Sequence, residues 1–368
     1  MAIVTRENIG VLNDKITVKI GKEDYLSSFE KSLKDYSKSA SLPGFRKGMV
    51  PSGLIKKMHG QSVFTDEVLK TVERELTKYM VDEKLDIFAQ PLPLADNDPR
   101  QLDVNNPAEY TFGFEVGLKP EFKIADLSKE KIPFYKIEVT DEMVNQQVER
   151  LQKGYGKKKD PDAGEEDENI EKAEVNEELF KAVYPGKEVK TEEDFRAEIK
   201  KEIEAYWETQ AKNHLQHEIY HRLLDHSEIT FPESFLKRWL ENSGEKRKSA
   251  EEIEKEYPSF VNQLKWTLIN DRIASEQKIE IKPEDLKEFA KKQLFGYMGM
   301  QSIGDDQPWV EEYVNKMMQD RRFIDDSYNR LATEKVFGWA EGEVQKEEKS
   351  ISMDDFNKLL QEHQHHHH

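Results

Sequence analysis

Three histidines and a glutamate between residues 214 and 221 have the types and spacing of a catalytic metal site. His217 and His221 flank Glu218 in the segment HEIYH, and His214 lies three residues before it. On a helix, two histidines four residues apart point the same way and can bind Zn²⁺, with the glutamate as general base for hydrolysis. At about 100° per residue, the three histidines fall within a sector of roughly 60°.

The rest of a metalloprotease pattern does not follow this segment. The longer form of the motif needs a glycine three residues after the second histidine and a further histidine three residues on. This chain has Leu224 and Ser227 at those positions. A histidine-rich helix meets the four-residue spacing by chance, so we predict no metal, no catalytic residue and no cofactor. A zinc hydrolase remains the least favoured alternative.

A second stretch with chemical potential is SLPGFRKGMVP, residues 41–51. Between its two prolines it contains, in order, Gly44, Phe45, Arg46, Lys47 and Gly48. Glycine and proline disfavour a helix or a central strand here, so we expect a stiff, exposed turn. The turn lies within residues 31–60, which contain seven Lys and Arg residues and a single acidic residue, Asp35, so their net charge is +6. This basic island predicts an anionic contact.

The whole chain has the opposite charge. Its 368 residues carry a net charge of −18, which argues against a general nucleic-acid binder because phosphates are repelled on average. Hydrophobic residues make up 36% and charged residues 35%, which favours thin-cored, helix-rich modules. No cysteine is present, so disulfides and cysteine metal sites are excluded. No apolar run approaches about 18 residues, so we expect no membrane-spanning segment.

The elements around the basic turn alternate between strand and helix patterns. We predict a strand ending at residue 20, helices over 22–40 and 62–83, strand-like segments over 86–118, an extended segment over 119–140 and a helix over 141–153. Residues 154–175 are acidic and nearly devoid of apolar side chains, as expected of a linker. The first 118 residues therefore read as an α+β domain.

The chain from residue 176 onward reads as helix. One helix opens with Thr191 as N-cap, runs to about residue 226 and carries one apolar stripe, formed by Phe195, Ile199, Ile203 and Tyr206. Others are predicted over 233–242, 258–278, 283–297, 307–345 and 353–361. The predicted fold is an α+β N-terminal domain followed by an elongated all-α C-terminal domain with arm-like helices.

Three ordered segments carry a family resemblance. They are the GFRKG turn with the helix SGLIKKMHGQSVFTDEVLKTVEREL, the segment LKPEFKIADLSKEKIPFYKIEVTDEMVNQQVERL, and the segment NEELFKAVYPGKEVKTEEDFRAEIKKEI. In this order they resemble trigger factor, the bacterial chaperone family that sits at the polypeptide exit of the ribosome. The resemblance covers nearly the whole chain. It implies a docking domain over 1–118, a connection over 119–175 and a helical chaperone domain over 176–362. The terminal HQHHHH, residues 363–368, has the composition of a purification tag.

One departure from the family is large. Trigger factors generally carry an FKBP-like prolyl-isomerase domain between the extended segment and the helical domain, whereas only residues 154–175 occupy that place here. Fewer than about 40 residues rarely fold alone. We therefore expect a trigger-factor form without the isomerase domain, and no enzyme.

The resemblance implies an ATP-independent chaperone that docks at the ribosomal exit and shields apolar segments of nascent or unfolded chains. It assigns ribosome binding to Gly44, Phe45, Arg46, Lys47 and Gly48, against the large subunit, through ribosomal protein with rRNA as a further contact. It also implies a cytoplasmic, partly ribosome-associated location and a homodimer away from the ribosome. The alternative is an RNA-binding or ribosome-assembly factor that uses residues 31–60.

A client-binding surface is sought among the apolar residues of the helical part. Most of its aromatic residues are needed for the core, but the segment FGYMGMQ, residues 295–301, combines aromatic residues, methionines and glycines. Methionine adapts to many apolar partners, and glycine weakens a rigid helix. The predicted client-binding residues are Phe295, Tyr297, Met298 and Met300.

Overall fold

The computed structural model describes residues 2–40, 45, 50–158, 170–244, 246–297 and 308–365. In these ranges no helix is both long and apolar enough to cross a lipid bilayer. The chain divides into two compact units. One joins Met1–Lys123 with Glu228–Lys265, and the other joins Ile124–Ser227 with Trp266–His368. Each unit is therefore built from segments that are distant in sequence.

The first unit is built on a four-stranded antiparallel sheet in the order β1-β2-β4-β3. Its strands are β1 (Ile3–Gly10), β2 (Asn13–Ile20), β3 (Leu92–Pro93) and β4 (Tyr110–Gly117). In the central strand β2, Ile16, Val18 and Ile20 are fully buried, while the residues between them are partly exposed. This alternation gives the sheet one apolar face.

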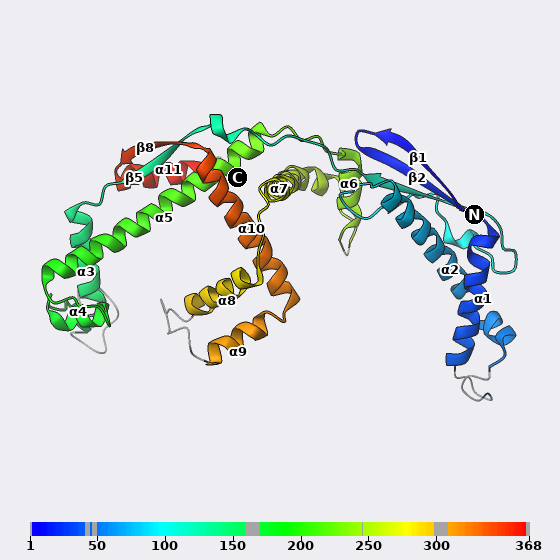
Figure 1. The fold of residues 1–368 in the computed structure, drawn as a ribbon, viewed down its shortest axis with the longest axis horizontal. Helices are drawn as coiled ribbons and strands as arrows, with labels where there is room; N and C mark the ends of the chain where they lie inside the picture. The colour runs from blue at the N-terminus through cyan, green and yellow to red at the C-terminus, as the bar shows by residue number, and fades with distance from the viewer. Residues whose placement is uncertain are drawn as a thin grey trace. The chain divides into compact units, whose positions relative to one another are not determined.

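Two helices cover that face and form a hairpin. Helix α1 (Lys22–Ser39) begins after Gly21, whose N–H donates to Asp24 Oδ2 at 2.9 Å. Helix α2 (Ser52–Asp82) returns beside α1, and both extend from the sheet (Figure 1). Phe64 of α2 meets the rings of Tyr25 and Phe29 edge-on at 5.4 and 5.2 Å. These buried rings fix the hairpin on the sheet.

A segment from the second half of the chain completes the first unit. Helix α6 (Glu233–Asn242) packs on β4, where Phe235 is fully buried against Gly117. The following helix α7 (Ala250–Glu276) continues into the second unit, and its Phe260 stacks on Trp239 of α6 at 5.9 Å. Residues 228–265 therefore belong to the same compact unit as the N-terminal sheet.

The second unit has a two-stranded parallel sheet, β5 (Lys131–Ile137) with β8 (Gln345–Ile351). The long helix α5 (Glu192–His226) lies along β5, and α11 (Met353–His365) packs against β5 as well. Their shared core is aromatic: Tyr135 of β5 contacts the rings of His214 and Phe356 at 5.4 and 5.7 Å. The sheet thereby joins the middle of the chain to its end.

Two smaller helical clusters complete this unit. Helices α3 (Asp141–Gly154) and α4 (Glu177–Val183) pack against the start of α5, where Phe180 stacks on Phe195 at 4.7 Å. Helices α8 (Pro283–Tyr297), α9 (Pro308–Met317) and α10 (Arg321–Glu343) form the second cluster. The remaining short elements are η1 (Pro99–Gln101), η2 (Leu127–Lys129), β6 (Lys157–Lys158) and β7 (Ile170–Glu171).

The predicted fold class is confirmed in its main division, a mixed N-terminal region followed by a mostly helical one. Several elements differ from expectation. Strand β1 was not predicted, α7 begins at Ala250 instead of residue 258, and the helix predicted over 307–345 is two helices, α9 and α10. Strand β8 interrupts the helical region, and α2 is one continuous helix where a break before residue 62 was expected. The division at residues 118 and 175 stays a prediction.

Candidate functional site

The hairpin of α1 and α2 fixes both ends of the basic turn. The Ser37 hydroxyl of α1 donates to the carbonyl of Val50 at 2.6 Å, which joins the last turn of α1 to the residue before Pro51. The Ala40 N–H closes α1 on the carbonyl of Tyr36 at 2.9 Å. With φ near −58°, Pro51 starts α2 in a conformation that its ring already favours. The chain therefore leaves and re-enters the hairpin at fixed points.

The structure describes one of the five predicted docking residues. Phe45 is 42% exposed, so its ring is not buried in the core of its own unit. Gly44, Arg46, Lys47 and Gly48 lie outside the described residues. An aromatic side chain exposed between two fixed helix ends is compatible with a contact to another molecule.

Cations continue the basic island along both helices. The exposed ones are Lys31, Lys34, Lys38, Lys56 and Lys57. Lys38 donates to Asp35 Oδ1 at 2.8 Å, and this hydrogen bond and charge lower the pKa of the Asp35 carboxyl. The acid of the island is thus ionised and paired at neutral pH.

A polar hollow beside the island was not predicted from the sequence. It has a volume of about 410 Å³ and is lined by residues of α1 and α2, among them Asp35, Asp66 and Glu67. Glu67 accepts hydrogen bonds from Ser32 and Lys70 at 2.9 and 3.1 Å. His59 lines the same hollow with its ring 5.0 Å from that of Tyr36. If α1 and α2 had been predicted to pack against each other, the helical spacing of Asp35, Asp66 and Glu67 would have placed these acids on the facing sides.

The predicted client-binding segment is described only in part. Phe295 is half-buried and packs against the core of Ala290, Leu294, Val310 and Val314. Tyr297, the last residue of α8, is 94% exposed. Met298 and Met300 lie outside the described residues. The structure therefore separates two residues that the sequence grouped, since one supports the core and the other faces solvent.

The three histidines of the candidate metal site on α5 do not converge on one point. His214 is buried between Tyr135 and Phe356, with ring distances of 5.4 and 5.9 Å. His217 and His221 lie further along the helix with their Nε2 atoms 3.2 Å apart. Among the described residues no three His, Asp or Glu side chains are placed to hold one metal ion. The arrangement lacks the three protein ligands usual for a zinc hydrolase.

Two polar clusters with structural roles were also missed. In the first unit Glu115 of β4 is 1% exposed, pairs with Arg238 of α6 and accepts from Asn13 Nδ2 at 2.7 Å. A lone acid inside the apolar strand YTFGFEVGL was the available signal. A buried carboxylate needs such partners because its desolvation is costly. The pair therefore holds α6 on the N-terminal sheet.

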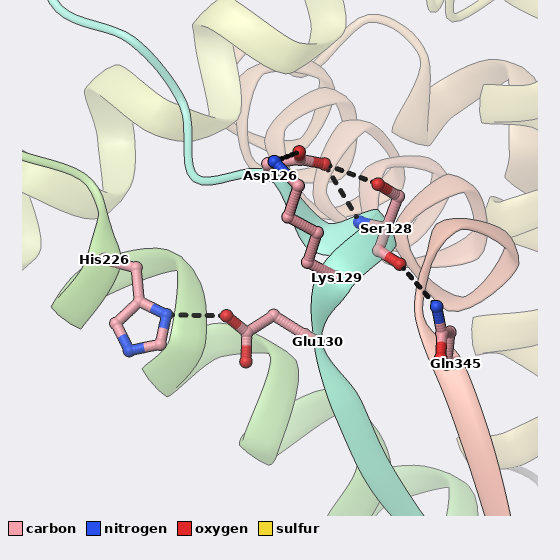
Figure 2. Close-up of polar contacts among 6 residues, drawn as sticks. All are labelled: Asp126, Ser128, Lys129, Glu130, His226 and Gln345. Atoms are coloured by element: carbon pink, nitrogen blue, oxygen red, sulfur yellow. Dashed lines mark hydrogen bonds and ion pairs between the residues drawn. The ribbon is translucent and has the colours of Figure 1, made fainter.

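The other cluster is a corner of the second unit, where the extended segment enters β5 (Figure 2). Asp126 accepts from the Ser128 hydroxyl at 2.6 Å and pairs with Lys129 at 2.7 Å, and hydrogen bonds from Lys129 and Ser128 lower the pKa of Asp126 to about 2. Gln345 Nε2 donates to the Ser128 carbonyl at 2.9 Å, while His226 Nδ1 lies 2.8 Å from Glu130 Oε1. These contacts join β5 to β8 and to the end of α5.

Comparisons with known proteins agree with this architecture. A family model described as bacterial trigger factor protein matches residues 2–151, and one described as probable trigger factor, C-terminal domain, matches residues 211–360. The trigger factor of Teredinibacter turnerae is 32% identical over 151 residues, which cover 41% of this chain and 33% of that protein. The trigger factor of Chlorobaculum parvum is 23% identical over an alignment that covers 78% of this chain and 86% of that protein.

A solved structure extends the likeness to the fold. It comes from work on promiscuous substrate recognition by the trigger factor chaperone, covers 92% of this chain and 98% of that chain, and has a TM-score of 0.55 at 14% identity. The two family models match in the order of the resemblance found in the sequence, with residues 152–210 between them. Together these matches show that the chain belongs to the trigger factor family, in a form without the middle isomerase domain.

Proposed function

We propose that the protein is an ATP-independent molecular chaperone that docks at the polypeptide exit of the large ribosomal subunit. There it shields apolar segments of nascent or unfolded chains. The observation that carries this proposal is the match of both trigger factor models to a chain whose basic turn is held by a two-helix hairpin. Family membership is the basis for the proposed function, and the hairpin of α1 and α2 is the proposed site of contact with the ribosome.

The docking residues of the proposal are Gly44, Phe45, Arg46, Lys47 and Gly48. The exposed ring of Phe45 supports this choice, as do the exposed lysines on the flanking helices. Arginine and lysine can pair with rRNA phosphate or with acidic side chains of a ribosomal protein, and an aromatic ring adds an apolar anchor. Residues 1–118 would then form the docking domain.

Client binding is proposed for the end of α8 and the residues that follow it. Tyr297 supports this, because a large side chain that is 94% exposed gains most from covering by an apolar partner. Phe295, Met298 and Met300 belong to the same proposed surface. Weak apolar contacts let a client leave when it folds, so release needs no nucleotide.

We also propose that the protein is not a prolyl isomerase. The two family models match N- and C-terminal domains alone, and most of the 154–175 segment is acidic and polar. From the family we further propose that residues 119–175 form a connection and residues 176–362 the chaperone domain. We also propose a cytoplasmic location and a homodimer away from the ribosome.

Replacing the three central residues of the turn tests the docking proposal. The combined variant Phe45→Ala, Arg46→Ala, Lys47→Ala is expected to lose cosedimentation with purified large subunits and to keep its ability to prevent aggregation of an unfolded protein. The variant removes both cations and the aromatic ring from the turn and changes no residue in the core of either unit. Cosedimentation of this variant at the level of the unchanged protein would show that docking uses another element.

A matched control removes the same kinds of side chain elsewhere. Tyr206, Lys200 and Lys201 are exposed on α5, so Tyr206→Ala, Lys200→Ala, Lys201→Ala deletes one aromatic ring and two cations outside the hairpin. This control is expected to cosediment normally. Binding to free rRNA as strong as binding to whole subunits, and equally salt-sensitive, would instead favour the RNA-binding alternative.

A further inference from the structure

The contact between His217 and His221 has no role in the proposed chaperone function. Both residues lie on α5 one turn apart, with ring centroids 4.4 Å apart and Nε2 atoms 3.2 Å apart. Side chains at i and i+4 face the same side of a helix, so the long helix itself produces this approach. The two nitrogens therefore lie close together because of secondary structure, and no loop has to place them.

The separation of the two nitrogens matches the bite of a chelated metal ion. Bonds from zinc to histidine nitrogen are about 2.0–2.1 Å long, so two such bonds at a tetrahedral angle span about 3.3 Å. The observed separation of 3.2 Å is close to this span, so chelation needs reorientation of the rings but no change in the distance between the two nitrogens. Without metal, one neutral imidazole at this distance can donate its Nε2 hydrogen to the other ring. When a cation binds both Nε2 atoms, the donor ring takes the tautomer with its hydrogen on Nδ1, so both rings stay neutral.

The chemistry of the ligands selects the class of metal. Imidazole nitrogen suits Zn²⁺, Cu²⁺ and Ni²⁺, whereas Mg²⁺ and Ca²⁺ prefer oxygen. His214 does not join the pair, since it is buried against Tyr135 and Phe356. No third ligand converges among the described residues. A bound ion would keep open positions for water or for a ligand from another molecule.

We propose that His217 and His221 form a two-histidine chelate for a divalent transition metal of the copper, nickel or zinc type. The site is a binding site without hydrolytic chemistry, because it lacks the third protein ligand usual for catalytic zinc. It also lies on a different element from both surfaces proposed for the chaperone function. Its failure would leave that function untouched.

Neighbouring aromatic residues provide a local reporter. The Tyr220 ring lies 5.2 Å from the His221 ring and 4.8 Å from the ring of Trp266. A paramagnetic Cu²⁺ ion held by the two histidines therefore lies close to this aromatic pair and is expected to quench Trp266 fluorescence. The part of the quenching that disappears in a Trp266→Phe variant is that of Trp266, and its loss in His217→Ala or His221→Ala assigns it to this site.

The experiment needs a chain without other metal-binding histidines. The C-terminal residues His363, His365, His366, His367 and His368 would bind the same ions, so all five are replaced by Ser in every variant. Calorimetric titration of this background protein with Ni²⁺ is expected to show one ion per chain. His217→Ala and His221→Ala are each expected to weaken binding at least tenfold, because each leaves a single imidazole.

Two controls separate chelation from the mere presence of histidine. His226→Ala removes an exposed histidine from the same helix and is expected to leave Ni²⁺ binding and Cu²⁺ quenching unchanged. His221→Ala with Asp225→His keeps the number of histidines but places the second ring two turns from His217, so binding is expected to fall as in the single variants. The proposal would be overturned if His217→Ala, His221→Ala or the His221→Ala, Asp225→His variant bound Ni²⁺ as tightly as the background protein. Absence of Ni²⁺ binding by the background protein would overturn it as well.

Discussion

At the scale of single residues, the sequence indicated side-chain chemistry better than side-chain environment. Phe45 was expected to be exposed, because glycine and proline disfavour a helix or strand in that segment, and its 42% exposure confirms this. Phe295 and Tyr297 were grouped together, yet only Tyr297 is highly exposed, because Phe295 packs against a core formed by α8 and α9. Burial of this kind depends on tertiary contacts that one segment does not encode.

Tyr25 is a residue whose environment makes stability depend on pH. Its hydroxyl donates to the Ala108 carbonyl at 2.7 Å, and burial raises the pKa of Tyr25 to about 12 from the ordinary 10.0. The neutral form is thus favoured in the folded state. The raised pKa of Tyr25 therefore stabilises the folded state fully below pH 10. This stabilisation is lost as the pH rises toward 12, and the free energy of unfolding falls by up to about 1.4 kcal/mol per pH unit.

We therefore expect Tyr25→Phe to cost about 1 kcal/mol at pH 8, where the hydrogen bond is lost, and less between pH 10 and 12. Urea unfolding followed by circular dichroism at several pH values measures this difference. Tyr36→Phe is the control, since Tyr36 is 41% exposed on the same helix. A difference between the unchanged protein and Tyr25→Phe that stays constant up to pH 12 would contradict the assigned environment.

At the scale of elements, periodicity predicted helices well and strand pairing poorly. Helices α6 and α8 have the predicted bounds, and α1, α3 and α5 differ from theirs by at most one residue. Helices α2 and α7 begin earlier than predicted, at Ser52 and Ala250. Within α5, Tyr206 was placed on the apolar stripe but is 56% exposed, and the adjacent Trp207 is buried instead. Strand β8 was missed because its sequence QKEEKSI is polar and its partner β5 lies some two hundred residues earlier.

The packing of α6 on β4 gives a prediction for one glycine. A Cβ atom at Gly117 would come within 2.7 Å of Phe235 Cε1, and closer still to Cδ1 of the same buried ring. Gly117→Ala is therefore expected to push α6 from the sheet and to cost about 1–3 kcal/mol of the free energy of unfolding. Trp239 on α6 reports the change, because its fluorescence depends on the stack with Phe260 during urea unfolding.

Gly338 on α10 provides the matched control with the opposite sign. No atom lies within 4 Å of a Cβ built there, so Gly338→Ala gains helix propensity without a clash. The expected gain is about 0.5–1 kcal/mol. If both alanine variants changed stability in the same direction, the close approach of Phe235 to Gly117 would not be the cause of the loss.

At the scale of the whole molecule, charge and apolar surface are segregated along the chain. The basic island occupies residues 31–60 of an otherwise acidic protein, while the exposed Tyr297 ends a helix of the second unit. The sequence could predict this segregation, because it depends on composition alone. It could not predict that residues 228–265 belong to the same unit as the N-terminal sheet, since contacts such as Arg238 with Glu115 join segments more than a hundred residues apart.

Segregation predicts that docking and client binding can be lost independently. Tyr297→Ser removes an almost fully exposed ring, so the fold is expected to remain while aggregation of an unfolded protein is suppressed at least twofold less well. Cosedimentation with large subunits should stay normal, the reverse of the result expected for the Phe45, Arg46, Lys47 variant. Tyr206→Ser, at an exposed site on α5, serves as control and should leave both activities intact. If Tyr297→Ser suppressed aggregation as well as the unchanged protein, the Tyr297 ring would not be part of the client surface, because its 94% exposure leaves loss of client contact as the main effect of the substitution.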